Sequence, residues 1–405
     1  MDHLCGKVLI NRFPALRHKN FRIFLIGQSI SLIGTWMQRA AQQWVIYELT
    51  KSAFIVGLVG VFQFTPLLLF SLFAGVFADR FPKKRVLLLT QTIQMLQAFT
   101  LAVLFWTGRI QYWHILILAG VLGLAHTFDM PTRQSFFIEL VGKEALGCAI
   151  GMNSSIVNIA RIIGPALGGL LLMYFGGTFC FFFNAFSFIA VLISLMKIQS
   201  YHVNIRKKGK NVFHEIKDGL KYIYAKEILF QAILSMLIVG TIAMNSDVII
   251  PVFAKEVLKQ QAGGYSLLLS SMGVGSLIGS LIFAGRSKIT FEKQNLMKTS
   301  LLLSVFLVFT GLLQNYYLVI FSLAGVGLFS MIFMATVNST IQLNSSDEYR
   351  GRAMGVYSMV FTGTTPIGNL FSGIVTQKFG ANASFITCGG LCTLLVLLLY
   401  LVKKQ

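Results

Sequence analysis

Long apolar segments recur along the whole chain and are separated by short polar intervals. A helix needs about 20 apolar residues to cross a bilayer core about 30 Å thick. The segments reach that length, so the pattern predicts an all-α membrane protein with twelve transmembrane helices. We expect these helices at residues 21–47, 54–77, 86–107, 113–135, 147–174, 177–197, 228–254, 265–285, 295–313, 316–340, 351–376 and 382–402.

The longest polar interval, residues 198–227, divides the twelve segments into two groups of six. We therefore expect an N-terminal six-helix half at 1–197, a linker at 198–227 and a C-terminal six-helix half at 228–405. Apolar residues between Phe213 and Tyr224 recur at helical spacing. This spacing predicts an amphipathic helix that lies on the cytoplasmic face of the membrane.

Charge is scarce and unevenly placed. Hydrophobic residues make up 55% of the chain and charged residues 12%, with a net charge of +20. The basic residues gather at the ends of apolar segments, which excludes a nucleic-acid surface and indicates a bilayer as the partner. Most of the 34 Lys and Arg residues fall on one side, so both termini are expected in the cytoplasm. The expected outer loops hold Lys51, Arg109, Lys255, Lys259 and Lys378.

No enzymatic group stands out along the chain. Neither a Walker A sequence, a cluster of metal ligands nor a pair of carboxylates is present. Cys388 and Cys392 lie one helical turn apart without His or acidic neighbours, which favours packing over a metal site. The sequence therefore predicts no catalysis, no metal and no cofactor, and energy must come from an ion gradient or from the gradient of a substrate.

An internal repeat supports two related halves. Residues 130–176 align without a gap with residues 334–380, with identical glycines at positions such as Gly164 and Gly368. A duplicated set of six helices places a substrate site between two pseudo-symmetric halves, near the middle of the membrane.

A short charged stretch lies at residues 75–85, between the second and third apolar segments. Its charges cannot enter hydrocarbon, and their excess of Lys and Arg favours a cytoplasmic loop. The stretch resembles the loop signature of the major facilitator superfamily, Gly-x-x-x-Asp-Arg-x-Gly-Arg-Lys-Arg, with Pro82 in place of a glycine. This resemblance implies the major facilitator fold and a gating loop; a loop that serves topology alone is the alternative. The gating residues would be Gly75, Asp79, Arg80, Lys83, Lys84, Arg85 and Arg133.

We expect Asp79 to accept hydrogen bonds from Arg133 and from the start of the eleventh helix. Such a contact would close the inner side of the transporter while the outer side is open. Replacing Asp79 with Asn would then favour the inward-open state and impair export.

A stripe of small residues marks the fifth segment. It resembles the antiporter motif of exporting major facilitators, Gly-x8-Gly-x3-Gly-Pro-x2-Gly-Gly, and this resemblance implies export and a stripe that packs between the two halves. Ordinary close packing of helices through small residues is the alternative. The stripe consists of Gly151, Ala160, Gly164, Pro165, Gly168 and Gly169.

Other stretches are similar to the branch that includes bacterial enterobactin-type siderophore exporters, among them residues 128–134 and 348–352. The resemblance implies a monomeric secondary transporter in the bacterial inner membrane. Such a protein would export a small organic molecule, a siderophore first, by proton antiport with alternating access. Multidrug or lipophile efflux is one alternative, and a transport-inactive membrane sensor or scaffold is another.

Ionisable residues inside membrane segments are functional candidates, because hydrocarbon penalises their charge. They are Arg39, His126, Asp129, Arg161 and Asp247. His126 and Asp129 are three residues apart and share a helix face, which suits proton binding near neutral pH. A buried pair that only locks the fourth helix to Arg161 or Arg133 is the alternative.

Arg39 and Asp247 are expected at nearly the same depth. At 1.5 Å per residue they lie about 27 Å and about 28 Å along the first and seventh helices. We therefore predict an outer gate in which the two charges pair when the outer ends meet. The alternative is that Arg39 reaches the outer headgroups and Asp247 takes a proton alone.

The family fold implies that the first, fourth, seventh and tenth helices line the central cavity. Amide and aromatic side chains on these helices suit a polyphenolic or amphiphilic ligand, although many aromatic residues must simply pack or face lipid. The predicted lining residues are Gln28, Trp36, Gln42, Gln43, Trp44, His126, Asn245 and Asn338.

Overall fold

The computed structural model describes residues 13–198, 212–285 and 293–401, and within these ranges the chain is helical without strands. The basic run at 206–210 and the loop at 286–292 lie outside the described residues. The helices are η1 (Pro14–Arg17), α2 (Lys19–Thr50), α3 (Ala53–Arg80), α4 (Lys83–Trp106), α5 (Tyr112–Val141), α6 (Leu146–Phe175), α7 (Gly177–Lys197), α8 (Val212–Ala225), α9 (Glu227–Ile242), α10 (Ser246–Val252), η2 (Phe253–Val257), α11 (Ala262–Ala284), α12 (Lys293–Leu312), α13 (Tyr316–Asn344) and α14 (Asp347–Leu401).

A helix lies at each of the twelve predicted positions, but only 10 described segments are long and apolar enough to cross a membrane by length and composition. Two features explain the difference. The segment Glu348–Leu401 contains two helices, joined at Gly380, where φ is 82°. The first helix, α2, is not among the ten because amides and Arg39 lower its hydropathy.

The sequence pattern predicts one continuous helix for the seventh span, but the structure interrupts this helix. α9 ends at Ile242 and α10 begins at Ser246. At the break, Asn245 Nδ2 donates to the carbonyl oxygens of Gly240 (3.2 Å) and Thr241 (2.8 Å). The amide thus satisfies carbonyl groups that the interrupted helix leaves without a backbone donor. Asp247 lies in the first turn of α10.

The chain forms two compact units. Unit 1 comprises Met1–Ala41 and Leu69–Lys208, and unit 2 comprises Gln42–Leu68 and Gly209–Gln405. The end of α2 and most of α3 therefore belong to the same compact unit as the C-terminal helices. The predicted domain limits at 197 and 228 come from the polar interval in the sequence, whereas the two units are defined by contacts between residues. These limits therefore stay a prediction.

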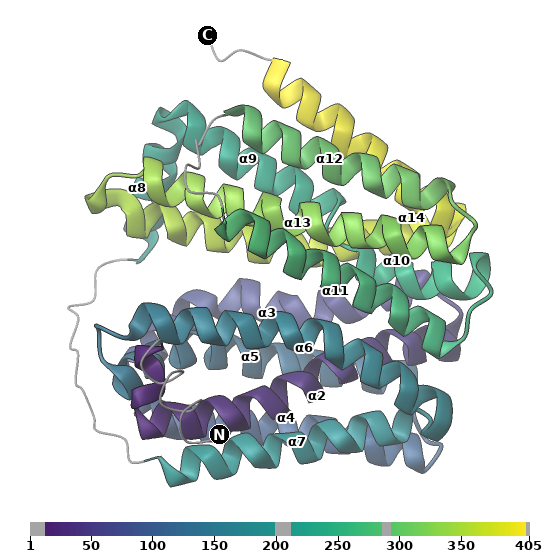
Figure 1. Cartoon of the computed structure of the whole chain (residues 1–405), viewed down its shortest axis with the longest axis horizontal. Coiled ribbons are helices and arrows are strands. Elements are labelled where there is room, and N and C mark those ends of the chain that lie inside the picture. Colours follow the sequence, from purple (N-terminus) through teal and green to yellow (C-terminus); the bar gives the residue numbers. More distant parts are fainter. Residues whose placement is uncertain (1–12, 199–211, 286–292, 402–405) are drawn as a thin grey trace, which may run out of the picture. The chain divides into compact units, whose positions relative to one another are not determined.

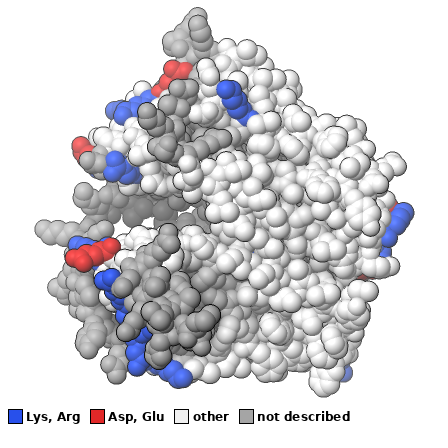
Figure 2. Space-filling view, viewed as in Figure 1, with Lys and Arg blue, Asp and Glu red and all other residues white. Residues whose placement is uncertain are grey.

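Each unit is a bundle of long helices (Figure 1). In unit 1, α4 packs against both α5 and α7. In unit 2, α11 packs along α13, while α12 and α9 pack along α14. On the face seen in Figure 2, described charged side chains gather near the helix ends, and the helix surfaces between them are uncharged. This distribution suits helices whose middle parts contact hydrocarbon.

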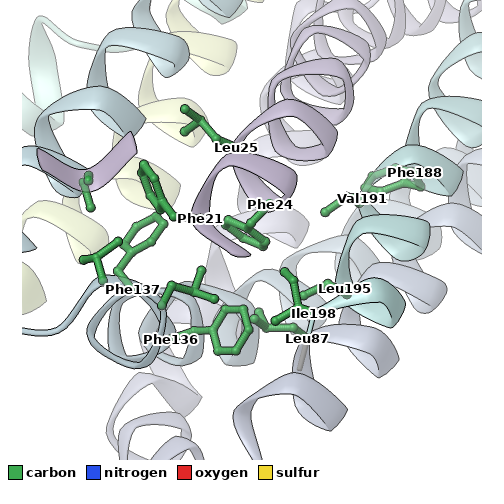
Figure 3. Packing of buried hydrophobic residues seen from close by; sticks show 14 of the residues in the cluster. Phe21, Phe24, Leu25, Leu87, Phe136, Phe137, Phe188, Val191, Leu195 and Ile198 are labelled. Atoms are coloured by element: carbon green, nitrogen blue, oxygen red, sulfur yellow. The ribbon is translucent and has the colours of Figure 1, made fainter. Parts of the chain in front are cut away.

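A phenylalanine-rich core fills one end of unit 1 (Figure 3). The ring centroids of Phe24 and Phe136 are 5.7 Å apart, and those of Phe21 and Phe137 are 6.1 Å apart, both in edge-to-face geometry. Leu87 of α4 belongs to the same buried cluster. This core joins the first turns of α2 to the last turns of α5.

The predicted amphipathic helix is present as α8, and it packs on the beginning of α14. The rings of Tyr222 and Tyr349 stack with centroids 4.5 Å apart. Arg352 Nη1 lies 3.4 Å from Asp218 Oδ2, and the Lys226 ammonium donates to the Asn344 carbonyl oxygen. One face of the linker helix is therefore bound to protein.

Candidate functional site

Residues of the predicted gating loop, at the start of α4, make polar contacts with the ends of α5 and α7 in unit 1. Pro82 caps the start of α4, where its missing N–H is no loss. Lys83 Nζ lies 2.7 Å from Glu139 Oε1 of α5, and both side chains are nearly buried. Lys84 Nζ donates to the carbonyl oxygen of Ile198, just after α7, at 2.7 Å. The two lysines therefore have structural contacts beyond setting topology.

The rest of the gating prediction is only partly described. Arg80 and Arg85 are exposed, and no atom would meet a side chain at Gly75 within 4 Å. Asp79 lies in the last turn of α3, but its side chain is outside the described part of the structure. The contact between Asp79 and Arg133 therefore stays a prediction.

The carboxylate of Asp129 is buried and fully engaged. Its Oδ1 accepts from Thr90 Oγ1 (2.8 Å) and Gln91 Nε2 (2.7 Å), and its Oδ2 accepts from Arg133 Nε (2.9 Å). Asp129 and Arg133 are four residues apart on α5, so their ion pair lies within one helix. Of the two partners that the sequence left open for Asp129, the structure describes the contact with Arg133.

His126 has a separate partner. Its Nε2 lies 3.0 Å from Gln94 Oε1, while Asp129 is bound by other groups. The two residues share a face of α5, but the described hydrogen bonds do not join them. His126 is half-buried, and Arg39 and Arg133 lie near enough for their charges to act on it.

Sequence reasoning missed a chain of amides through the middle of unit 1. Asn184 Nδ2 donates to Gln38 Oε1 at 2.7 Å, and Gln38 Nε2 donates to Gln97 Oε1 at 3.1 Å. The three residues come from α7, α2 and α4 and are buried. The available signal was the set of polar residues on α4, Thr90, Gln91, Gln94 and Gln97, which recurs at helical spacing in an apolar segment.

The small-residue stripe of α6 packs on α2 within unit 1. A Cβ added at Gly164 would lie 2.6 Å from Trp36 Cβ, and one at Gly168 would lie 3.2 Å from the Met37 carbonyl oxygen. Ala160, Pro165 and Gly169 are also buried. The described partner is thus a helix of the same half. The first member of the stripe, Gly151, has open space around it.

Trp36 lies between two guanidinium groups of unit 1. The Cζ atom of Arg39 is 5.1 Å from the centroid of its ring, and the Cζ atom of Arg161 is 5.0 Å away. Both distances are within the range of a cation–π interaction. Three residues singled out separately by the sequence therefore form one cluster.

The predicted outer end of α2 contacts η2 and α11 within unit 2. Tyr47 Oη donates to Glu256 Oε1 at 2.9 Å, and Lys255 Nζ lies 3.0 Å from Glu48 Oε1. The rings of Trp44 and Tyr265 stack at 5.2 Å. Trp44, predicted to line a cavity, thus packs against another aromatic ring.

The start of α3 also packs closely in unit 2. A Cβ at Gly57 would lie 2.5 Å from the Asn369 carbonyl oxygen of α14, and a Cβ at Gly373 would lie 3.1 Å from the Ala53 carbonyl oxygen. Close approach of this kind requires small residues. Residues 53–60 of α3 and residues 369–373 of α14 therefore form a glycine-lined seam.

The other predicted cavity residues are mostly buried. Gln28, Gln42, Gln43 and Asn245 are buried, and Asn338 accepts from Gln342 Nε2. A cavity between the halves, and the Arg39–Asp247 pair, would join the two units and stay predictions. Among the described residues no group of three or more His, Cys, Asp or Glu could hold a metal ion.

A family model described as transmembrane secretion effector matches residues 10–404. The staphyloferrin A transporter of Staphylococcus aureus is 24% identical over 394 residues, which cover 95% of this chain and 96% of that protein. Macrolide efflux protein A of Streptococcus pyogenes is 22% identical over 381 residues, which cover 90% of this chain and 91% of that protein. These relatives confirm the resemblance to major facilitators with siderophore-transporter members.

Solved structures of transporters share the fold. The D-xylose-proton symporter superposes with a TM-score of 0.76 at 11% identity, covering 94% of this chain and 97% of the symporter. A bacterial homolog of the human lysosomal transporter Spinster, in an inward-facing and unoccupied conformation, gives a TM-score of 0.72 at 12% identity and covers 94% of each chain. At such identities the likeness shows the fold alone.

The contact of Gly164 with Trp36 predicts a sharp contrast within the stripe. Gly164→Leu should lower the thermal unfolding temperature of the purified protein, because forcing a side chain into a closed seam costs about 1–3 kcal/mol. Gly151→Leu is the matched control and should leave that temperature unchanged, since its surroundings are open. Equal stability of the two variants would contradict a seam at Gly164.

The engagement of Asp129 predicts strong coupling with Arg133. Asp129→Asn should lower the free energy of unfolding by about 3–5 kcal/mol, because it leaves the Arg133 guanidinium partly buried without its counter-charge. The double variant Asp129→Asn/Arg133→Gln should lose less than the sum of the single variants. Chemical denaturation in detergent measures the four stabilities. Strict additivity would show that the ion pair contributes nothing.

Proposed function

Because the chain belongs to the transmembrane secretion effector family of major facilitator transporters, we propose that it exports a small organic molecule by alternating access. The chain is a multi-pass membrane transporter and not an enzyme. A siderophore is the proposed cargo and the bacterial inner membrane the proposed location. The staphyloferrin A transporter supports this cargo, while the macrolide efflux relative favours broader efflux as the second candidate.

The main observation that supports alternating access is the set of contacts at the predicted outer end of α2. Residues 42–68 come from the first two helices, yet they pack with the C-terminal helices in unit 2. Part of that attachment is the ion pair of Glu48 with Lys255, whose side chains are 34% and 28% exposed. Such pairs contribute about 0–1 kcal/mol each, so they can form and break during a transport cycle.

Proton antiport is part of the proposal, and His126 is its best-placed carrier. Asp129 is held by three donors that stabilise its charged form. His126 contacts a neutral amide and is half-buried, and imidazole is the side chain whose unperturbed pKa lies closest to neutral pH. The charges of Asp129, Arg133 and Arg39 act on the imidazole of His126. We therefore assign proton binding to the imidazole rather than to the carboxylate.

Transport itself is tested in proteoliposomes that contain the purified chain. With an acidic lumen, protons leave as substrate enters, so the vesicles should accumulate a transported probe. The probes are one catecholate siderophore, one carboxylate siderophore, and ethidium for broad efflux. Accumulation of a siderophore supports the first candidate, and accumulation of ethidium alone supports the second. Movement of no probe under any gradient would favour the sensor or scaffold.

The assignment of His126 predicts a selective loss of coupling. His126→Gln can still hydrogen-bond to Gln94 but carries no proton, so uphill accumulation should fall at least about tenfold. Exchange of probe without a gradient should continue. His114→Gln, at the predicted outer end of α5, is the matched control and should behave as the wild type. Full uphill accumulation by His126→Gln would remove His126 from the coupling mechanism.

The ion pair at the outer end predicts a charge-swap result. Glu48→Lys should place three lysine ammonium groups together, with Lys51 and Lys255, and weaken closure of the outer side. Lys255→Glu should do the same through repulsion with Glu48. Each single variant should slow probe accumulation, and the double swap should recover part of the rate. Lys378→Glu, an exposed charge on α14, controls for a general effect of charge. A double swap as slow as the single variants would count against the pair.

A further inference from the structure

A cavity of about 280 Å³ lies within unit 2, at the predicted outer end of α2. Its walls come from the end of α2, the start of α3, η2 and the break in α14, which are far apart in the sequence. Pockets for drug-sized ligands measure about 300–1,000 Å³, so this cavity suits a smaller chemical group. Its polar and aromatic lining residues include Tyr47, Lys51, Glu256, Gln377, Phe379 and Asn382.

The backbone around this cavity departs from regular α-helix at three points. Lys51 has a φ of 49°, which lies in the left-handed region that a lysine rarely adopts. Glu256 belongs to η2, which is a π-helix. Gly380 turns the chain at the break in α14 with a φ of 82°. Non-glycine residues with positive φ and π-helical turns both concentrate at functional sites, so their meeting at one cavity points to a binding site.

Opposite charges flank the Tyr47 side chain in the cavity wall. Nζ of Lys51 is 5.8 Å from the centroid of the Tyr47 ring, and Tyr47 Oη donates to Glu256 Oε1 at 2.9 Å. The other carboxylate oxygen of Glu256 can therefore accept from a ligand. Lys51 Nζ lies 2.8 Å from Glu48 Oε2, but this pair is exposed and an ammonium group has three donors. Lys51 can thus bind an anionic group in addition to Glu48.

Neutral polar groups complete the lining. Gln377 Oε1 accepts from the Phe54 N–H at 3.5 Å, and Asn382 Nδ2 donates to the Gly311 carbonyl oxygen at 2.9 Å. The amide nitrogen of Gln377 and the amide oxygen of Asn382 are therefore the atoms that can bind a ligand. The cavity thus offers a donor of each kind, charged and neutral, together with an acceptor of each kind. This set of groups matches a ligand that carries both a positive and a negative charge.

We propose that this cavity binds a zwitterion that carries a primary ammonium group and a phosphate. Glu256 accepts from the ammonium and Lys51 donates to the phosphate, both through charge-assisted hydrogen bonds. Two sources offer this chemistry, the headgroup of phosphatidylethanolamine in the outer leaflet and free phosphoethanolamine. A ligand held by both walls joins α2 to η2 and stabilises the state in which these helices meet. This effect on the cycle, but not the binding itself, rests on the proposed alternating access.

Equilibrium binding to the purified, delipidated full chain in detergent tests the site. The probes are dihexanoyl phosphatidylethanolamine and dihexanoyl phosphatidylglycerol, which has the phosphate but lacks the ammonium group. Wild type should bind the first at least about tenfold more tightly, as expected for one hydrogen bond to a charged group. Glu256→Gln should weaken phosphatidylethanolamine binding at least about tenfold and leave phosphatidylglycerol binding unchanged. Lys51→Gln should weaken binding of both lipids, because both carry the phosphate.

Matched controls separate this result from misfolding and from a general effect of charge. Lys378→Gln and Glu348→Gln change exposed residues of α14 that do not line the cavity, so both should bind as the wild type does. Thermal unfolding of each variant shows whether it is folded. Absence of phosphatidylethanolamine binding, or equal binding by wild type, Glu256→Gln and Lys51→Gln, would overturn the inference.

Soluble phosphoethanolamine, as a third probe, identifies the source of the ligand. Binding as tight as that of the lipid supports a free zwitterion. Binding of the lipid alone supports a membrane ligand whose glycerol and acyl groups contact Phe379, a lining residue that is 70% exposed. In either case the binding should depend on both Glu256 and Lys51.

Transport measurements distinguish failure of the inference from failure of the proposed function. If a siderophore or ethidium accumulates in proteoliposomes while phosphatidylethanolamine binding is the same in all variants, export stands and the zwitterion site is wrong. If the lipid binds in a Glu256-dependent way but no probe moves under any gradient, the zwitterion site stands and export is wrong.

Discussion

Hydrocarbon supplies no hydrogen bonds, so every polar side chain inside the spans needs a partner within the protein. Unit 1 provides such partners in two places. The charge of Asp129 is shared among Arg133, Thr90 and Gln91, and the amides of Gln38, Gln97 and Asn184 form a chain through three helices. These contacts fix the rotation of the helices, because a turned helix would leave buried polar atoms without partners.

Glycine provides the second constraint. Gly164 allows α6 to approach α2 at the position of Trp36, and Gly57 allows α3 to approach α14. In a membrane, where apolar side chains gain little by leaving lipid, such close packing is a main source of helix association. The first seam also places the guanidinium group of Arg161 beside the ring of Trp36.

The ion pairs of unit 1 and of the predicted outer end of α2 differ in how deeply they are buried. In unit 1 the ion pair of Asp129 with Arg133 is largely buried, and breaking such a pair is costly. At the outer end, Glu48 and Lys255 are about one-third exposed, so their attraction is screened by water. This contrast suits the proposed alternating access, in which the helix bundles persist while weaker contacts between helices break.

The sequence by itself determined where helices form and which carry charge. Apolar length placed all twelve segments, and the motifs at Asp79 and Gly164 pointed to a family that the comparison of residues 10–404 confirms. Only the tertiary structure decided which side chains meet. It broke the seventh span at Asn245, left Gly151 outside the seam and gave His126 a glutamine partner. Hydropathy depends on local composition, whereas these contacts depend on how each helix is rotated and how closely its neighbours approach.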